Sequence, residues 1–441
     1  MDRRWRIRPT AWATLVVLCS PLSCTSVPPP SGEPIALARL RLEDIGLGDS
    51  QVRTWPGLMR DDRGLKLGGI FSALCHAPGE PESVFYCAAD RGPNGLVEIE
   101  GERRRTFPVP EYSPRIYKLR GEQGLLHIIE EIGIRTQGGA PVTGLPNTDD
   151  DEAPYGHDGT TRLPLNPNGL DVEGLAVARD GSFWIADEYR PSLARITGDG
   201  TVQVRLIPRG VTLPADSDVR PVLPAIYAQR RLNRGFEGVA LNSADSLLFA
   251  VMESPLDFPA AAVGRASHMV RILVVDALRW IPVAEHVYVA ERAADLGETD
   301  QGEIRLSDVA CVNGTTLLVV ERTPHVSRVY RIDLEHATNI LGTGWSDPGN
   351  TADPLEALSP EQLRPRGLTP VSKTLLVDLA RIPDMPSKIE GLAIVNSTTL
   401  ALGNDNDFSF EGFDPQGQAI DREVPSSLIL LQLPRALPLD R

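Results

Sequence analysis

The sequence predicts an all-β protein, a β-propeller of six blades with long loops between its strands. Three short phrases in which a glutamate and a glycine open an apolar run recur far apart, at residues 172–176, 236–240 and 389–393. A second β-rich run follows each phrase and ends on acidic or amide residues. Repeats of about 40 to 50 residues built from short strands are typical of propellers, and the longer spacing here indicates inserted loops.

The clearest repeat, residues 174–207, shows one whole blade. Turn signals divide it into four predicted strands, at residues 175–178, 182–186, 193–197 and 202–207. Two weaker copies lack the Glu-Gly opening, one at residues 307–321 with Asp308 as its carboxylate and one at residues 68–93. Residues 115–118 and 125–129 supply strands for the sixth predicted blade.

Length and composition fit one large globular domain. The chain has 441 residues, of which 41% are hydrophobic and 23% charged, so it can bury a large core. The 39 glycines and 38 prolines suit the many turns of such a fold. Because the repeats run from residue 68 to residue 410 without a linker, we expect residues 34–441 to form a single propeller domain.

The first 33 residues have a different character. Four arginines precede the apolar stretch 11–22, which is too short to span a bilayer. The pattern predicts an export signal at residues 1–23 and a Pro/Ser-rich tether at residues 24–33. Ser23-Cys24 resembles a bacterial lipoprotein cleavage site, so lipidation of Cys24 and plain secretion are both open. Either route leads to the periplasm or the cell envelope.

The charge balance limits the possible partners. The formal net charge of −15 repels nucleic acid and anionic lipid surfaces and is compatible with cation binding. We therefore expect a small-molecule partner, no nucleic acid, and membrane attachment only through a lipid on Cys24. We also expect a monomer.

Two cysteines are candidates for a disulfide. Cys75 and Cys87 flank the turn 76–83 between two strands that we expect to be adjacent. In an oxidising compartment they would form a cross-strand disulfide, and the alternative is two buried thiols. No cysteine or histidine spacing suggests zinc.

The usual catalytic signatures are missing. The sequence has no G-x-S-x-G, H-E-x-x-H, G-x-x-x-x-G-K or G-x-G-x-x-G motif, and its seven histidines are scattered singly. These absences leave the repeated carboxylates as the candidate functional groups, with no residue assigned as catalytic.

The repeated carboxylates predict a cation site. The first strand of each propeller blade lines the central channel, so a glutamate at its start lies at one channel mouth. Carboxylates gathered there repel one another unless a cation neutralises them, and calcium takes six to eight oxygen ligands in irregular geometry. The predicted calcium ligands are Glu173, Asp187, Glu237, Glu390 and Asp405.

Further polar residues near these positions are candidates for ligand binding. The predicted substrate-binding set is Asp90, Arg91, Glu188, Asn404, Asn406 and Asp407. Arg91 has two interpretations, as an anion-binding side chain or as an ion-pair partner within the ring, and Glu188 is similarly ambiguous. The repeated glutamates also have a structural interpretation, in which each one caps a turn or locks one blade to the next.

Five ordered motifs resemble one family. Residues 89–94, 169–176, 183–189, 235–238 and 404–408 look like the phytase-like family of exported bacterial proteins, described as having "esterase-like activity of phytase". The resemblance implies a β-propeller that hydrolyses phosphate or other esters. The leading hypothesis is a calcium-dependent ester or phosphoester hydrolase of the cell envelope. The alternatives are a non-enzymatic ligand- or partner-binding propeller with a structural cation, and a lactonase-type carboxylic ester hydrolase.

Overall fold

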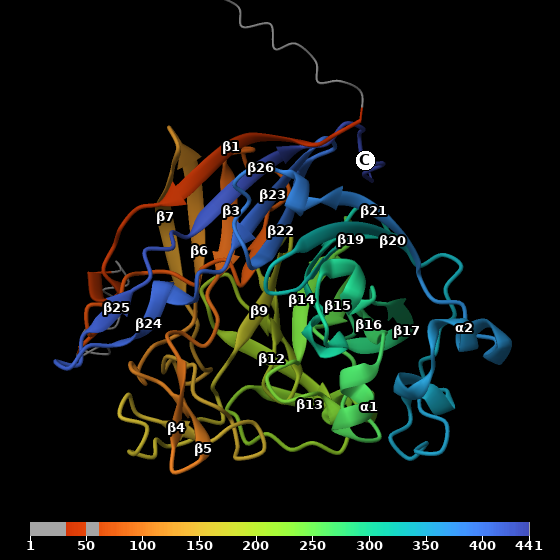
Figure 1. Cartoon of the computed structure of the whole chain (residues 1–441), viewed down its shortest axis with the longest axis horizontal. Coiled ribbons are helices and arrows are strands. Elements are labelled where there is room, and N and C mark those ends of the chain that lie inside the picture. Colours follow the sequence, from red (N-terminus) through yellow and green to blue (C-terminus); the bar gives the residue numbers. More distant parts are fainter. Residues whose placement is uncertain (1–31, 50–60, 441) are drawn as a thin grey trace, which may run out of the picture. The chain divides into compact units, whose positions relative to one another are not determined.

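The computed structural model describes residues 32–49 and 61–440 (Figure 1). The described residues from Pro34 onward belong to one compact unit. The predicted export signal, Cys24 and most of the predicted tether lie outside the described residues. Within the described part of the chain, no helix is long and apolar enough to cross a membrane.

The unit is an all-β propeller built from blades of four strands, numbered from the inner strand outward. The first blade contains β2 (Ala73–Cys75), β3 (Val84–Ala88), β6 (Arg115–Glu122) and β7 (Leu125–Gly133). The second contains β9 (Val172–Val177), β10 (Phe183–Asp187), β11 (Ser192–Ile196) and β12 (Val202–Pro208), and β13 (Asp218–Leu223) is added in parallel to β12. The third contains β14 (Phe236–Leu241), β15 (Leu247–Met252), β16 (Met269–Asp276) and β17 (Ile281–Val289).

The last two blades complete the ring. The fourth contains β18 (Arg305–Cys311), β19 (Thr316–Arg322), β20 (Ser327–Asp333) and β21 (Ser372–Asp378). The fifth contains β22 (Ile389–Asn396), β23 (Thr399–Asn404), β26 (Ser427–Gln432) and β1 (Ile35–Leu42). The inner strands β2, β9, β14, β18 and β22 contact one another in a closed cycle, and Figure 1 shows the blades following one another in chain order.

The ring therefore has five blades in the described residues, and the expected sixth is not among them. The strands predicted for it lie in β6 and β7, which are the outer strands of the first blade. The N-terminal strand β1 was not predicted as part of a blade. It pairs antiparallel with β26, from Ile35 opposite Gln432 to Arg41 opposite Ser427, and thus closes the last blade with the start of the domain.

The remaining elements lie in the long connections. They are the helices α1 (Ala261–Ala266) and α2 (Pro360–Leu363), the small sheets β4 (Gly95–Ile99), β5 (Glu102–Thr106), β8 (Pro154–Tyr155) and β24 (Phe410–Phe413), β25 (Ala419–Asp421), and several 3-10 turns. These turns are Leu47–Asp49, Ala225–Gln229, Ala293–Leu296, Gln301–Glu303, Gly344–Ser346, Leu355–Ala357, Arg364–Arg366, Leu379–Arg381 and Asp407–Ser409. Apolar side chains from neighbouring blades fill the spaces between the sheets, with Trp184, Tyr227 and Phe236 among the most deeply buried.

A β-bulge near the start of four inner strands positions the mouth residues. The register between the first and second strands shifts there, and one residue of the inner strand has no partner. The extra residues are Glu173, Glu237, Ser307 and Glu390. The repeat pattern predicted Asp308 as the equivalent of the glutamates, but Asp308 occupies the position of the glycine that follows each glutamate. A bulge bends the strand and re-aims its side chain, and three of these residues, Glu173, Glu237 and Glu390, line the cavity at the mouth of the channel.

The glycines after the bulges allow the inner strands to approach closely. A Cβ atom on Gly174 would lie 2.8 Å from the Cα of Gly238, and one on Gly238 would lie 2.8 Å from the Cα of Asp308. Neither contact can relax by turning a side chain, because the opposing atoms belong to the backbone. The backbones of adjacent inner strands therefore determine how tightly the ring closes.

Substitution of Gly174 by Ala tests this packing. We expect Gly174→Ala to lower the free energy of unfolding by about 1 to 3 kcal/mol, because overpacking must displace the third blade. Gly314→Ala is the matched control, since no described heavy atom lies within 4 Å of a Cβ placed there. Chemical denaturation of both variants measures the difference, and equal stability would contradict close backbone packing.

Candidate functional site

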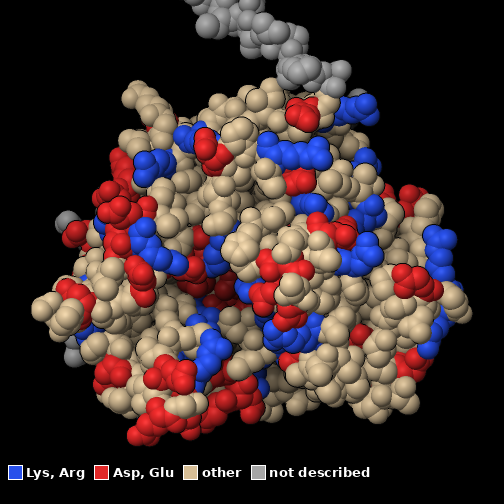
Figure 2. All heavy atoms as spheres, viewed as in Figure 1, with Lys and Arg blue, Asp and Glu red and all other residues tan. Residues whose placement is uncertain are grey.

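A cavity of about 290 Å³ lies where the inner strands begin, and acidic residues dominate its lining. Figure 2 shows acidic side chains within a hollow near the centre of the face in view. The lining residues are Asp90, Glu173, Glu188, Glu237, Glu253, Glu390, Asp405 and Asp407, the cations Arg91, Arg105, Arg305, Arg322 and Lys388, and the amides Asn94 and Asn233. A larger cavity of about 560 Å³ is lined by later residues of the same strands, such as Leu175 and Val309, and by mainly apolar side chains.

The second strand of each blade supplies one residue to this mouth. The residues opposite the bulge glycines, or opposite Asp308, are Ala186, Val251, Val320 and Gly403. Two positions further along the chain lie the cavity residues Glu188, Glu253, Arg322 and Asp405. In the first blade Ala73 lies opposite Ala88, and two positions further lies Asp90, which also lines the cavity. The mouth thus has one residue of this kind from every blade.

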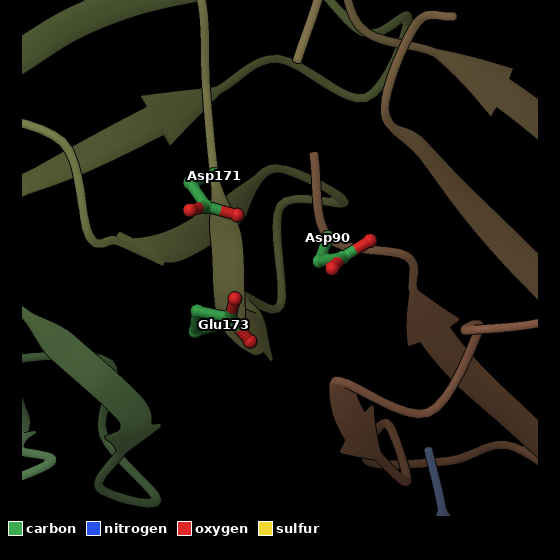
Figure 3. A group of neighbouring side chains, drawn as sticks. All are labelled: Asp90, Asp171 and Glu173. Carbon is green, nitrogen blue, oxygen red and sulfur yellow. The ribbon is translucent and has the colours of Figure 1, made fainter. Parts of the chain in front are cut away.

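The first carboxylate group consists of Asp90, Asp171 and Glu173, each with a carboxylate oxygen within 4.8 Å of the others (Figure 3). Asp90 follows β3, Asp171 precedes β9, and Glu173 is the bulge residue of β9. Removal from water raises the pKa of Glu173 well above its ordinary value of 4.5, and Glu237 and Asp171 raise it further. Asp171 also accepts a 3.1 Å hydrogen bond from the backbone N–H of Arg91.

The second carboxylate group consists of Glu188, Glu237 and Glu253, again within 4.8 Å of one another, and all three are buried. Burial and neighbouring carboxylates raise the pKa of both Glu188 and Glu237 well above 4.5. The Oε2 atom of Glu253 accepts no hydrogen bond from the described residues. Its guanidinium neighbour Arg234 lies 3.7 Å away, and Arg305 lies 3.6 Å from the other oxygen. This group therefore contains a buried oxygen that is ready to accept a ligand.

The remaining carboxylates of the mouth lie beside cations. Glu390 contacts the Arg322 guanidinium and lies 3.5 Å from the Lys388 ammonium. Lys388 also pairs with Asp405 and lies 2.5 Å from Asp407. Glu390 and Asp405 thus reach the predicted mouth, but side chains of the protein already neutralise them.

Asp187 is not at the mouth, which corrects its prediction as a calcium ligand. Side chains alternate along the second strand, so Asp187 points away from the cavity that Glu188 lines. Its carboxylate is fully buried, pairs with Arg205 at 2.6 Å, and accepts the backbone N–H of Asp171 at 2.9 Å. Burial raises the pKa of Asp187 to about 6. The residue fastens the second blade instead of binding at the channel.

The predicted substrate-binding residues divide in the same way. Asp90, Arg91, Glu188 and Asp407 line the cavity, but Asn404 and Asn406 do not. Asn404 accepts the N–H of Ser427 at 2.8 Å, and Asn406 accepts the N–H of Gly69 at 2.7 Å. These two amides hold neighbouring segments of the backbone.

Arg91 is an ion-pair partner within the site. Its guanidinium lies 3.0 Å from Asp171 and 3.4 Å from Glu152, and it also contacts Asn233. The side chain lines the cavity while it neutralises part of the first carboxylate group.

The predicted disulfide is wrong, since Cys75 and Cys87 are free thiols. The register places Cys75 opposite Tyr86 and Cys87 opposite Leu74. The two side chains therefore point to opposite faces of the blade. Burial raises the pKa of both thiols.

Sequence reasoning missed Asp171, Glu253, Arg322 and Lys388. Glu253 and Arg322 lie at positions equivalent to Glu188, and counting from the bulge along each repeat would have found them. Asp171 was within a recognised motif, but its proximity to Asp90 depends on the packing of two blades. Lys388 reaches the mouth from the residue before β22.

The chain belongs to the phytase-like family described as "Esterase-like activity of phytase", whose model matches residues 67–408. An uncharacterized secreted protein of Arthroderma benhamiae is 22% identical over 288 residues, which are 56% of this chain and 56% of that protein. The match thus spans about half the length of this curated relative.

Comparison with solved structures gives only distant likenesses. The PQQ-bound aldose sugar dehydrogenase of Streptomyces coelicolor is 12% identical, with 83% of this chain and 95% of that chain covered and a TM-score of 0.34. U3-55K is 14% identical, with coverages of 82% and 95% and a TM-score of 0.35. These scores add nothing to what the strand topology shows.

The raised pKa values predict how the stability of the metal-free protein depends on pH. Glu173, Glu188 and Glu237 bind protons more tightly in the folded state, so the unfolded chain releases protons first as the pH rises above 4.5. The folded state then loses stability as the pH increases through their folded-state pKa values.

Thermal unfolding in chelator from pH 5 to pH 8 measures this dependence. We expect the midpoint to fall with rising pH, and to fall less in the double variant Glu173→Gln, Glu237→Gln. The comparison of the two proteins removes the contribution of other groups. Parallel pH profiles of the two proteins would contradict the assignment of this pH dependence to Glu173 and Glu237.

Proposed function

We propose that this protein is a calcium-dependent ester or phosphoester hydrolase of the cell envelope, with its active site at the carboxylate-lined mouth. The observation that carries the proposal is the pair of carboxylate groups, each with three oxygens within 4.8 Å. Both groups offer oxygen donors alone, which suits calcium, and neither contains a histidine or cysteine. The buried Oε2 of Glu253 supports the fit, because it has no hydrogen-bond donor among the described residues.

The residues of the mouth have distinct roles in this proposal. Asp90, Asp171 and Glu173, or Glu188, Glu237 and Glu253, would hold the ion. When bound, the ion would supply Lewis-acid activation of the ester and of a water molecule. Glu237 has a raised pKa and lines the cavity, so it is suited to accept a proton from the attacking water. Arg91 and Arg305 line the same cavity and would face the negative charge that develops on the ester oxygen.

The pairing of the cavity cations favours the two alternatives, a lactonase-type hydrolase of carboxylic esters and a non-enzymatic binding propeller. Each of the five cations of the cavity already has a carboxylate within 4.0 Å, so a phosphate group would have to compete for it. A lactonase-type hydrolase of carboxylic esters needs no free cation for its substrate. A non-enzymatic binding propeller with a structural cation needs none either.

Export completes the proposal. The Arthroderma benhamiae relative is described as secreted, which supports export of this chain. We propose that residues 1–23 direct this export, that Cys24 provides a lipid anchor when it is acylated, and that the protein works as a monomer on a small molecule.

Calcium should stabilise the folded protein. We expect the unfolding midpoint of residues 34–441 to rise by several degrees with excess calcium relative to chelator. A ligand that binds only the folded state at 100 times its dissociation constant adds about 2.7 kcal/mol. Differential scanning fluorimetry with magnesium as the comparison ion measures the effect. An unchanged midpoint, with no metal in the purified protein, would contradict a calcium site.

Glu237→Gln separates catalysis from folding. The substitution removes the proposed proton acceptor and one oxygen ligand, so hydrolysis should fall by about 100-fold or more while the metal-free stability is retained. The matched control is Glu335→Gln, which neutralises an exposed glutamate that does not line the cavity. Parallel assays with aryl phosphates and aryl acetates show which ester class is preferred. Full activity of Glu237→Gln would contradict the assignment, and no turnover of either ester by the wild type would favour the binding protein.

A further inference from the structure

The mouth contains five pseudo-equivalent junctions between adjacent blades. At three of them, the cavity residue that follows the second strand of one blade meets the bulge residue of the next blade. In ring order, the first junction pairs Asp90 with Glu173, the second Glu188 with Glu237 and the fourth Arg322 with Glu390. At the third junction the bulge residue is Ser307, and at the fifth the inner strand β2 has no bulge. The first two junctions bring two carboxylates together, whereas the fourth joins a carboxylate to an arginine.

Arg322 is the basic residue among five equivalent second-strand positions, of which the other four are acidic. The residue is only 2% exposed. Its Nε donates a 2.6 Å hydrogen bond to the Ser307 hydroxyl, and its terminal nitrogen contacts the Glu390 carboxylate. A serine at bulge position 307, where three other blades have glutamate, supplies the acceptor that the Nε–H requires. Arg322 and Ser307 both depart from the repeat pattern, and the hydrogen bond between them shows that the two changes act together.

A side chain can satisfy the same electrostatic requirement as a bound ion. Two carboxylates held side by side away from water need a proton or a cation between them. At the fourth junction the guanidinium occupies the acidic position, and together with Lys388, which lies 3.5 Å from Glu390, it neutralises the Glu390 carboxylate. A divalent ion placed there would meet a positive charge a few ångströms away, which opposes its binding.

We propose that Arg322 is a built-in replacement for a cation at the junction of the fourth and fifth blades, and that it confines divalent ions to the first two junctions. The inference rests on the proposed calcium site and adds the residue that determines how many ions the mouth accepts and where. The second carboxylate group supports the contrast, because Glu253 there retains a buried Oε2 without a hydrogen-bond donor among the described residues. Arg322 acts as a positioning residue and not as a group that reacts with substrate.

Arg322→Glu places a second carboxylate beside Glu390, as at the second junction, while Lys388 remains 3.5 Å from Glu390. Calcium bound per chain is counted by equilibrium dialysis followed by elemental analysis, on wild type and variant under the same conditions. We expect the variant to bind one additional ion per chain. Arg105→Glu is the matched control, because it makes the same change of charge in the lining of the same cavity, but Arg105 lies outside the five ring positions and pairs with Glu152. The control should bind the wild-type number of ions, with at most a change of affinity.

The outcomes distinguish failure of the proposed calcium site from failure of the inference about Arg322. A wild type that binds no calcium contradicts the proposed function itself. A wild type that binds calcium, together with an Arg322→Glu variant that binds no additional ion, overturns this inference alone. An additional ion in both Arg322→Glu and Arg105→Glu also overturns it, because general electrostatics would then explain the gain.

Folding of the variant provides a second readout. If Arg322→Glu folds only with calcium present, the ion replaces the guanidinium, which supports the inference. Arg322→Gln, which leaves Glu390 without its guanidinium partner, should then show a larger calcium-induced rise of the unfolding midpoint than the wild type. An equal rise of the unfolding midpoint in Arg322→Gln and wild type overturns the inference. Failure of both variants to fold in calcium also overturns it, because the shape of the arginine side chain, and not its charge, would then be required.

Discussion

The carboxylates of neighbouring blades repel one another, and the mouth of this propeller nevertheless holds them a few ångströms apart. Closure of the ring imposes this arrangement. The inner strands approach so closely that Gly174 and Gly238 have backbone atoms where a side chain would begin. The repulsion is relieved in two ways around the ring. Arg322 and Lys388 neutralise Glu390 and Asp405, whereas the two groups around Glu173 and Glu237 hold raised pKa values and are suited to a bound cation.

The geometry of the site follows from two local features of the β-sheet. A bulge turns one residue of the inner strand toward the channel, and strict alternation decides which residue after the second strand joins it. A shift by one position moves a carboxylate from the mouth to the interior of a blade. Asp187 and Glu188 show the difference, since the first pairs with Arg205 within the second blade and the second lines the cavity.

The sequence was sufficient to predict the fold class, the family and most of the acidic mouth, because the Glu-Gly phrases repeat at equivalent points of the blades. The predicted number of blades was too high, because the outer strands β6 and β7 form an antiparallel hairpin whose sequence pattern resembles that of a separate blade. The place of β1 in the last blade could not be predicted, because β1 pairs with β26 at the other end of the domain. Asp187 was wrongly predicted as a ligand, because a shift of one residue in register cannot be read from a repeat that contains bulges. Counting from the bulge would have found the position of Arg322, but its role could not be predicted, because its partner Glu390 lies in the next blade.

Crystallography of the protein grown with manganese, as an anomalous substitute for calcium, shows directly whether the mouth holds a metal ion. We expect anomalous difference density between Glu188, Glu237 and Glu253, or between Asp90, Asp171 and Glu173, within bonding distance of their carboxylate oxygens. We expect none beside Arg322. A map without density at either carboxylate group, or with density at the Arg322 junction, would contradict the view that repelling carboxylates at the mouth are held for a metal ion.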